Sequence, residues 1–170
     1  GEKWSIQTIA PTGEAPVALS MILDNNGVPH VGYRADGLNY ARRAEQGWEI
    51  QLVDGGETFG SGDISIALDS LGFPHIGYYV DSKETMQRSL RHAFWTGTEW
   101  NIQAIGDTEE PGGKIEIDHP LPCSISLALD SNNLPHLVYG NGDTVMYAHW
   151  ASNWSIQVVD DRGSGWYVSI

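Results

Sequence analysis

The chain has 170 residues, 41% of them hydrophobic, and its 22 acidic residues outnumber the 9 Lys and Arg to give a formal net charge of −13. This surplus argues against a nucleic-acid partner, whose phosphates are neutralised by Lys and Arg, and no apolar run is long enough to predict membrane insertion. The single cysteine, Cys123, excludes an internal disulfide.

A pattern of the form Ser-x-x-Leu-Asp, a short turn, Pro-His and Tyr occurs three times, at residues 20–33, 65–78 and 126–139. Each copy is followed by a second short apolar run and then by a run that opens with Trp. These runs are rich in β-branched and aromatic residues and are bounded by turn residues, which predicts four strands in each repeat. No segment has a helical period. Four short strands in a repeating unit are typical of a β-propeller blade.

The sequence therefore predicts an all-β fold, a partial β-propeller with three complete four-stranded antiparallel blades. We expect the blades at residues 17–54, 62–106 and 123–160. Residues 3–10 match only the last strand of a blade, and residues 163–170 match only a first strand. Three blades are fewer than the four to eight that close a ring. The sequence is consistent either with a piece of a longer chain or with a ring that other chains complete.

The repeated polar and aromatic residues are expected to build the blade. An Asp before a turn accepts hydrogen bonds from turn amides; calcium is the less favoured alternative, because the turns are poor in acids. A His after Pro is expected to bond a neighbouring group, with no metal shared between blades. A Trp that opens a strand is expected to pack between blades, the alternative being a ring that stacks on a sugar. These residues are Asp24, Asp69, Asp130, His30, His75, His136, Trp4, Trp48, Trp100 and Trp154.

Two segments, residues 80–89 and 106–122, are longer than their counterparts in the other repeats. Both connections leave a four-stranded meander on the same side, and insertions on one side of a repeat array commonly mark the binding face. The alternative is an acidic, solvated loop without a partner. The candidate ligand-binding residues of this loop face are Asp81, Lys83, Glu84, Arg88, Asp107, Glu109, Glu110, Glu116, Asp118 and His119.

The repeated sequence pattern resembles repeats of bacterial β-propeller proteins. It reads Ser-x-x-Leu-Asp-x-x-Gly-x-Pro-His, an apolar residue, x and Tyr, followed by Leu-x-Tyr-Ala and a strand opened by Trp. It is more loosely similar to sialidase-like and lectin-like propellers, although the sialidase Asp-box is absent. Asn133 stands where the other repeats have Gly27 and Gly72, and Asn tolerates the positive φ of such a turn. The resemblance implies a propeller architecture and favours an extracellular or cell-surface location in a bacterium.

The function expected from these features is a binding or scaffolding module that recognises a carbohydrate or a protein through the loop face. No nucleophile elbow, phosphate loop or zinc-spaced Cys/His cluster is present, so no catalytic residue or cofactor is predicted. One alternative is a glycan-cleaving propeller enzyme. Another is a structural protein whose chains join through the terminal strands into a closed oligomer or a filament.

Overall fold

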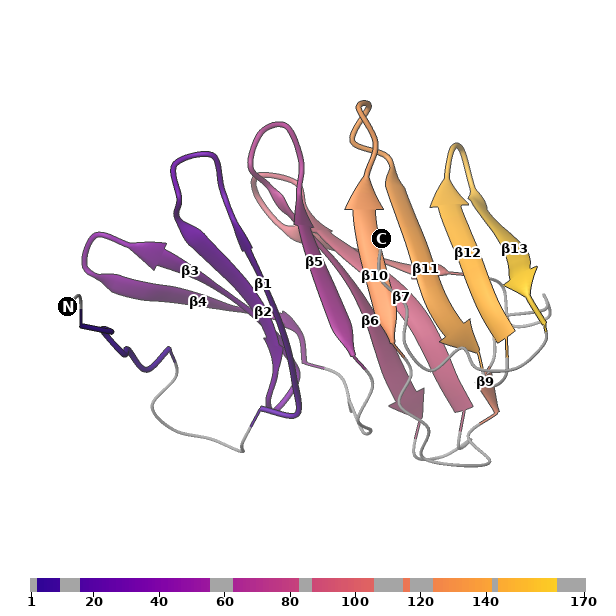
Figure 1. Ribbon diagram of the computed structural model, residues 1–170, viewed down its shortest axis with the longest axis horizontal. Helices are drawn as coiled ribbons and strands as arrows, with labels where there is room; N and C mark the ends of the chain where they lie inside the picture. The colour runs from indigo at the N-terminus through magenta and orange to yellow at the C-terminus, as the bar shows by residue number, and fades with distance from the viewer. Residues whose placement is uncertain are drawn as a thin grey trace.

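The computed structural model describes residues 3–9, 16–55, 63–82, 87–105, 115–116, 124–141 and 144–161. These residues form strands and turns, with no helix among them. The strands make three separate antiparallel sheets, each following the chain order of its strands (Figure 1). This arrangement confirms the all-β, partial propeller fold, and the ring is not closed.

Blade 1 consists of β1 (Ala18–Leu23), β2 (Pro29–Arg34), β3 (Leu38–Ala44) and β4 (Gly47–Asp54). Blade 2 consists of β5 (Ile64–Leu68), β6 (Pro74–Ser82), β7 (Gln87–Trp95) and β8 (Trp100–Ile105). Blade 3 consists of β10 (Ile125–Leu129), β11 (Pro135–Asn141), β12 (Thr144–Trp150) and β13 (Trp154–Asp160).

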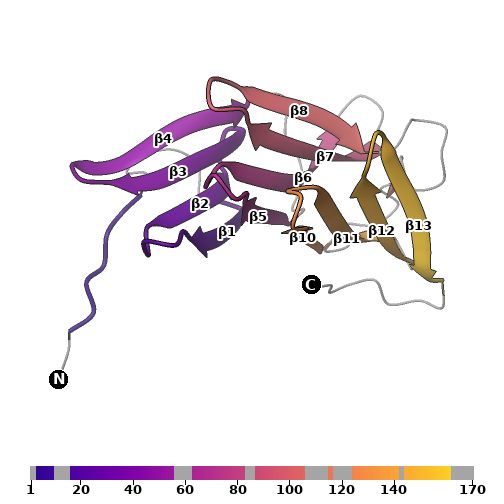
Figure 2. The ribbon, with the colours of Figure 1, turned by 90° about the horizontal axis from the view of Figure 1, so that it is seen from above.

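The three blades stack like adjacent segments of a fan. The first strands, β1, β5 and β10, lie side by side at the inner edge, and the last strands, β4, β8 and β13, lie farthest from it (Figure 2). The turns β1–β2, β5–β6 and β10–β11 all project to one side of the stack, at the top of Figure 1. We call this side the short-turn rim.

Two apolar clusters hold the blades together. Between blades 1 and 2, Leu38 and Tyr40 pack with Ile64, Ile76 and Tyr78. Between blades 2 and 3, the members include Tyr79, Leu90, Leu137, Tyr139 and Met146. Because successive residues of a strand point to opposite faces, adjacent Tyr78 and Tyr79 serve the two different interfaces. Burial on both sides explains why the strands of blade 2 read as continuous apolar runs.

The first insertion differs from the expected long turn, because most of it is strand. β6 continues to Ser82 and β7 begins at Gln87, and Asp81 is directly opposite Arg88 in this ladder. A two-residue strand, β9 (Ile115–Glu116), comes from the second insertion and pairs with the start of β7. The backbone therefore brings the two insertions together, and Asp81 and Arg88 account for the longer hairpin through their cross-strand attraction.

The strands expected at the two ends of the chain, in residues 3–10 and 163–170, stay predictions. Residues 3–9 are described without a strand, and Trp4 is 97% exposed. A strand needs a partner for its backbone groups, so the assignment of this segment to another blade stays a prediction. Residues 163–170 and Cys123 lie outside the described residues. Within the described ranges, no helix has the length and apolar character needed to cross a membrane.

Candidate functional site

The repeated Asp carboxylates organise the turns of the short-turn rim. Asp24 Oδ1 accepts the amides of Asn26 and Val28, each at 2.8 Å. Asp69 and Asp130 accept the amides two and four residues later in the same way. The bond from the Val28 amide is the main reason that the pKa of Asp24 is lowered. Each carboxylate thus holds a turn, and the described residues contain no group of three or more His, Cys, Asp or Glu placed for a metal.

The positive-φ position of these turns is filled as its sequence implies. Gly27 and Gly72 have φ values of 76° and 80°, and Asn133 has a φ of 62°. Glycine adopts this conformation without steric cost, and asparagine is among the residues that tolerate it. The three turns therefore share one shape, which places the following Pro-His pair at the same height in each blade.

Each repeated His is bonded to the third strand of its own blade. His30 Nδ1 lies 2.6 Å from the Tyr40 hydroxyl, and His136 Nδ1 lies 2.6 Å from the Tyr147 hydroxyl. In blade 2 a second histidine replaces the tyrosine, and His75 Nδ1 is 3.0 Å from His92 Nε2. Each of these bonds engages one ring nitrogen of the repeated His within its own blade.

Two of the repeated tryptophans close the interface with the preceding blade. The Trp100 ring meets the Tyr40 ring of blade 1 edge-on at 5.5 Å, and the Trp154 ring meets the His92 ring of blade 2 edge-on at 5.6 Å. Trp100 Nε1 also donates to Gln51 Oε1 at 2.9 Å. These contacts make each tryptophan part of the joint between two blades, as is common for large aromatic residues.

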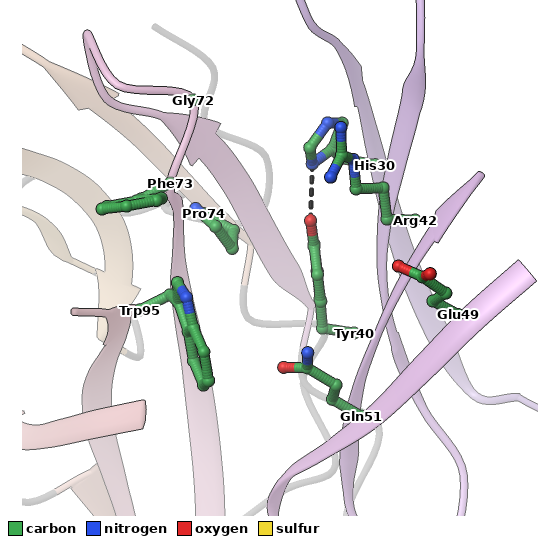
Figure 3. A pocket seen from close by; sticks show the side chains of 9 residues that line it. All are labelled: His30, Tyr40, Arg42, Glu49, Gln51, Gly72, Phe73, Pro74 and Trp95. Carbon is green, nitrogen blue, oxygen red and sulfur yellow. Dashed lines mark hydrogen bonds between the residues drawn. The ribbon is translucent and has the colours of Figure 1, made fainter. Parts of the chain in front are cut away.

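A cleft of about 150 Å³ opens between blades 1 and 2 on the short-turn rim (Figure 3). Blade 1 supplies polar side chains from its second, third and fourth strands, and blade 2 supplies apolar groups from its first turn and the end of β7. The lining residues are His30, Tyr40, Arg42, Glu49, Gln51, Gly72, Phe73, Pro74 and Trp95. In Figure 3 the Phe73 and Trp95 rings face Tyr40 and Gln51 across the gap.

A second hollow of about 310 Å³ adjoins the cleft, since the two share His30, Arg42, Gly72 and Phe73 as lining residues. It reaches over the Asp24 turn of blade 1. Small-molecule sites commonly measure about 300 to 1,000 Å³. The pair of hollows, which we call the rim cleft, therefore suits a small ligand.

Two charged side chains of the rim cleft have no partner among the described residues. Arg42 and Glu49 are exposed and lie on neighbouring strands, opposite each other in the ladder, and no hydrogen bond or ion pair of the described chain engages either. Burial, with a smaller effect of the Arg42 charge, lowers the pKa of His30. The neutral His30–Tyr40 pair thus forms a fixed floor beside one cation and one carboxylate.

The corresponding positions between blades 2 and 3 have different chemistry. Phe94 stands where blade 1 has Arg42, and Asn101 stands where it has Glu49. The Phe94 ring stacks on His75 at 5.6 Å and on His92 at 5.4 Å. The charged pair is therefore special to the first interface, although the repeat itself continues.

The predicted loop face is described only in part. Asp81 and Arg88 form a buried ion pair, with Arg88 Nε 2.6 Å and Nη2 3.0 Å from the two carboxylate oxygens, and they are 6% and 4% exposed. Glu116 lies on β9, of which only the backbone is described. Seven further candidates lie outside the described residues: Lys83, Glu84, Asp107, Glu109, Glu110, Asp118 and His119. Ligand binding by this face stays a prediction.

Sequence reasoning missed the rim cleft because it weighed the repeated residues and the insertions. The cleft depends on strand positions that are equivalent in the three repeats but carry side chains of different chemical type. Comparing the third strands residue by residue gives Arg42, Phe94 and His149 at one position. Comparing the fourth strands gives Glu49, Asn101 and Ser155. The rim cleft could have been found from charged residues that occur at these surface positions in one repeat alone.

No family model matches the sequence, and no curated protein matches it. Among solved structures, the fold is similar to that of a fucose lectin from Kordia zhangzhouensis, determined in complex with methyl-fucoside. The TM-score is 0.52 at 17% sequence identity, and the match covers 82% of this chain and 96% of the lectin chain. At this identity the similarity concerns the fold.

Proposed function

We propose that the protein is a carbohydrate-binding module and that the sugar occupies the rim cleft. The observation that carries the proposal is the unengaged pair of Arg42 and Glu49 in a cleft whose opposite wall carries Trp95. A guanidinium and a carboxylate can bind neighbouring hydroxyl groups through charge-assisted hydrogen bonds. An indole face offers an apolar surface to the C–H groups of a sugar ring.

The mixed charge of the cleft selects the class of ligand. An anion would meet Glu49, a cation would meet Arg42, and the net charge of −13 adds repulsion for anions. A neutral polyol both donates and accepts hydrogen bonds, so it satisfies both side chains without leaving a buried charge unpaired. Gln51, held by Trp100, adds an amide on the same wall.

The fold similarity to a fucose lectin supports a carbohydrate ligand and suggests the first probe. Recognition through the loop face remains a separate prediction, with a protein as the alternative partner. A glycan-cleaving activity has less support. Hydrolysis of glycosides normally uses a pair of carboxyl groups, and of the two carboxylates that line the rim cleft, Glu49 and Asp24, the second is engaged by turn amides.

The test is a titration of the protein with methyl-fucoside and a panel of neutral monosaccharides, followed by calorimetry, with a glycan array for longer ligands. Arg42→Gln and Glu49→Gln each remove one charge from an exposed side chain. Each is expected to weaken binding at least about tenfold, since a hydrogen bond to a charged group contributes about 1.5 to 3 kcal/mol. The melting temperature should stay near that of the parent protein.

The matched control compares two tryptophans with the same local contact. Trp95 meets Trp100 edge-on at 5.6 Å, and Trp150 meets Trp154 edge-on at 5.6 Å. Only Trp95 lines the rim cleft. Trp95→Ala should abolish sugar binding, and Trp150→Ala should leave it intact at a similar cost in stability. Equal affinities of both variants, or binding that survives loss of Arg42 and Glu49, would move the site elsewhere.

A further inference from the structure

The outward face of blade 1 exposes a row of large apolar side chains. Leu19, Met21 and Leu23 of β1 are 66%, 59% and 55% exposed, and Leu52 of β4 is 59% exposed. Side chains of this size on one face of a sheet, with no covering element among the described residues, are unusual in a stable surface. The face therefore has the composition of a buried interface.

The repeat shows what normally covers this face. Ile64 and Ile66 hold the positions of Leu19 and Met21 in blade 2, and they are 5% and 6% exposed against blade 1. Ile125 and Leu127 hold the same positions in blade 3, and both are 6% exposed against blade 2. In both cases the covering element is the far face of the preceding blade.

Blade 3 ends the described stack with a face of the covering kind. Ala128 and Tyr147 occupy the positions of Ile22 and Tyr40, by which blade 1 covers blade 2. Its His136–Tyr147 bond repeats the His30–Tyr40 bond at the same length, 2.6 Å. The two outer faces of the chain are thus the two halves of an interface that the chain already forms twice.

The face of blade 3 that corresponds to the covering faces of blades 1 and 2 has a larger side chain at one position. The residue that would lie against it on blade 1 is smaller than its counterparts in blades 2 and 3. Gly32 and Gly77 allow Ile76 and Leu137 of the next blade to approach closely. Blade 3 has Val138 at this position, and blade 1 has Val31 where the next blades have Ile76 and Leu137. A larger residue on one face therefore meets a smaller residue on the other, which preserves part of the interface volume.

We propose that a second copy of this chain docks blade 1 on blade 3, and that two copies close a ring of six blades. Six lies within the four to eight blades that close propellers, whereas three copies would give nine. Each copy contributes one face of each kind, so the ring has two equal contacts and leaves neither outer face exposed. The proposal is independent of the sugar site.

Light scattering coupled to gel filtration measures the mass in solution. We expect a species of twice the 18.6 kDa of one chain. Because each copy carries a net charge of −13 and the contact is apolar, the dimer should strengthen with added salt. A monomer at every concentration and salt would overturn the proposal and leave the faces to other partners, such as further repeats of a longer polypeptide. A mass that grows without limit would overturn ring closure.

Exposed residues provide variants that fold. Leu19→Lys and Met21→Lys place an ammonium in the contact and should weaken dimerisation at least about a hundredfold, because a buried unpaired charge is strongly unfavourable. Leu71→Lys is the matched control, since Leu71 is 75% exposed on the β5–β6 turn, away from both faces. A dimer that resists Leu19→Lys and Met21→Lys would overturn the proposed contact.

A mixing experiment distinguishes this contact from a blade 1 to blade 1 contact. Leu19→Lys damages the blade 1 face, and Val138→Lys damages the blade 3 face. Each variant alone has two damaged contacts in a ring, but a ring with one copy of each keeps one intact contact. The mixture should therefore recover dimer that neither variant forms alone. Failure to recover it, with both variants folded, would contradict the head-to-tail geometry.

Discussion

At the scale of single residues, one repeated position uses two different chemistries. The imidazole after Pro bonds a tyrosine in blades 1 and 3 and a histidine in blade 2. A tyrosine hydroxyl keeps its proton over the whole physiological range. A pair of imidazoles bonds only while one nitrogen carries a proton and the other a lone pair. Blade 2 therefore contains a pH-sensitive bond that its neighbours lack.

We expect acid to destabilise the protein through His92. Burial, with a smaller effect of His75, lowers the pKa of His92 to about 3, and burial also lowers the pKa of His75. The folded state therefore binds fewer protons than the unfolded state between the unfolded value of 6.5 and about 3. Stability is full above 6.5 and falls below it, by about 2 kcal/mol for His92 between pH 7 and pH 5. Urea unfolding across this range measures the slope.

The matched control for this prediction is His92→Tyr, which copies the pairing of blades 1 and 3. It should keep the fold and flatten the dependence of unfolding free energy on pH, leaving the part that His75 contributes. A slope unchanged by His92→Tyr would assign the acid sensitivity to other groups.

At the scale of elements, blades meet through paired inner strands and small residues. Ser65 Oγ accepts the Leu127 amide at 3.0 Å, and Ser20 Oγ accepts the Ile66 amide at 3.3 Å. These bonds satisfy one backbone amide each on β5 and β10, the first strands of blades 2 and 3. The repeated Ser of the sequence pattern thus joins one sheet to the next, which explains its presence in a largely apolar strand.

Two glycines of the covering faces should respond differently to the same change. A Cβ at Gly77 would lie 2.8 Å from Leu137 Cδ2 and 2.9 Å from Ile125 Cδ1, whereas at Gly32 the nearest atom, Ile64 Cδ1, would be 3.5 Å away. Gly77→Ala should lower the unfolding free energy by about 1 kcal/mol through overpacking. Gly32→Ala should leave it unchanged or raise it by about 0.5 kcal/mol by restricting the unfolded chain.

The measurement is the urea midpoint of each glycine variant. Equal destabilisation by both would mean that the interfaces between blades 1 and 2 and between blades 2 and 3 are equally tight, contrary to the geometry.

The strands could be predicted because their signals are local. Alternation, turn residues and the position of Asp and Gly fix the short hairpins within a few residues of their observed bounds. The hairpin around residues 80–89 was not predicted, because its extension depends on a pairing between Asp81 and Arg88 across the turn. The rim cleft was not predicted either, because Arg42 and Trp95 belong to different repeats and line one cleft only when two sheets stack.

At the scale of the whole molecule, the stack is not uniform. Blade 2 is covered on both sides, and Tyr78 and Tyr79 are fully buried, whereas blades 1 and 3 each have one face that no other described strand covers. In arrays of repeats, stability is approximately a sum of unit and neighbour contributions. The middle blade therefore receives two neighbour contributions and each outer blade receives one.

Hydrogen exchange on dilute protein should show this gradient. We expect the slowest amides in β6 and β7 and the fastest among the strands in β4 and β13, because local opening is easiest where few apolar contacts hold a strand. Mass spectrometry of peptides from each strand measures the rates. Identical protection in all three blades would mean that the chain unfolds as one cooperative unit and would contradict the gradient.

The rim cleft lies at an interface between two repeats, and this position affects how such proteins can diversify. Its chemistry comes from outward side chains such as Arg42 and Glu49, while the residues that join the blades, such as Ser20, Trp100 and Gly32, do not line it. Duplication of a repeat adds a new interface between blades and leaves the existing apolar clusters unchanged. Exchange of two surface residues beside that interface then gives it a binding specificity of its own. Architecture and recognition are thereby free to evolve separately.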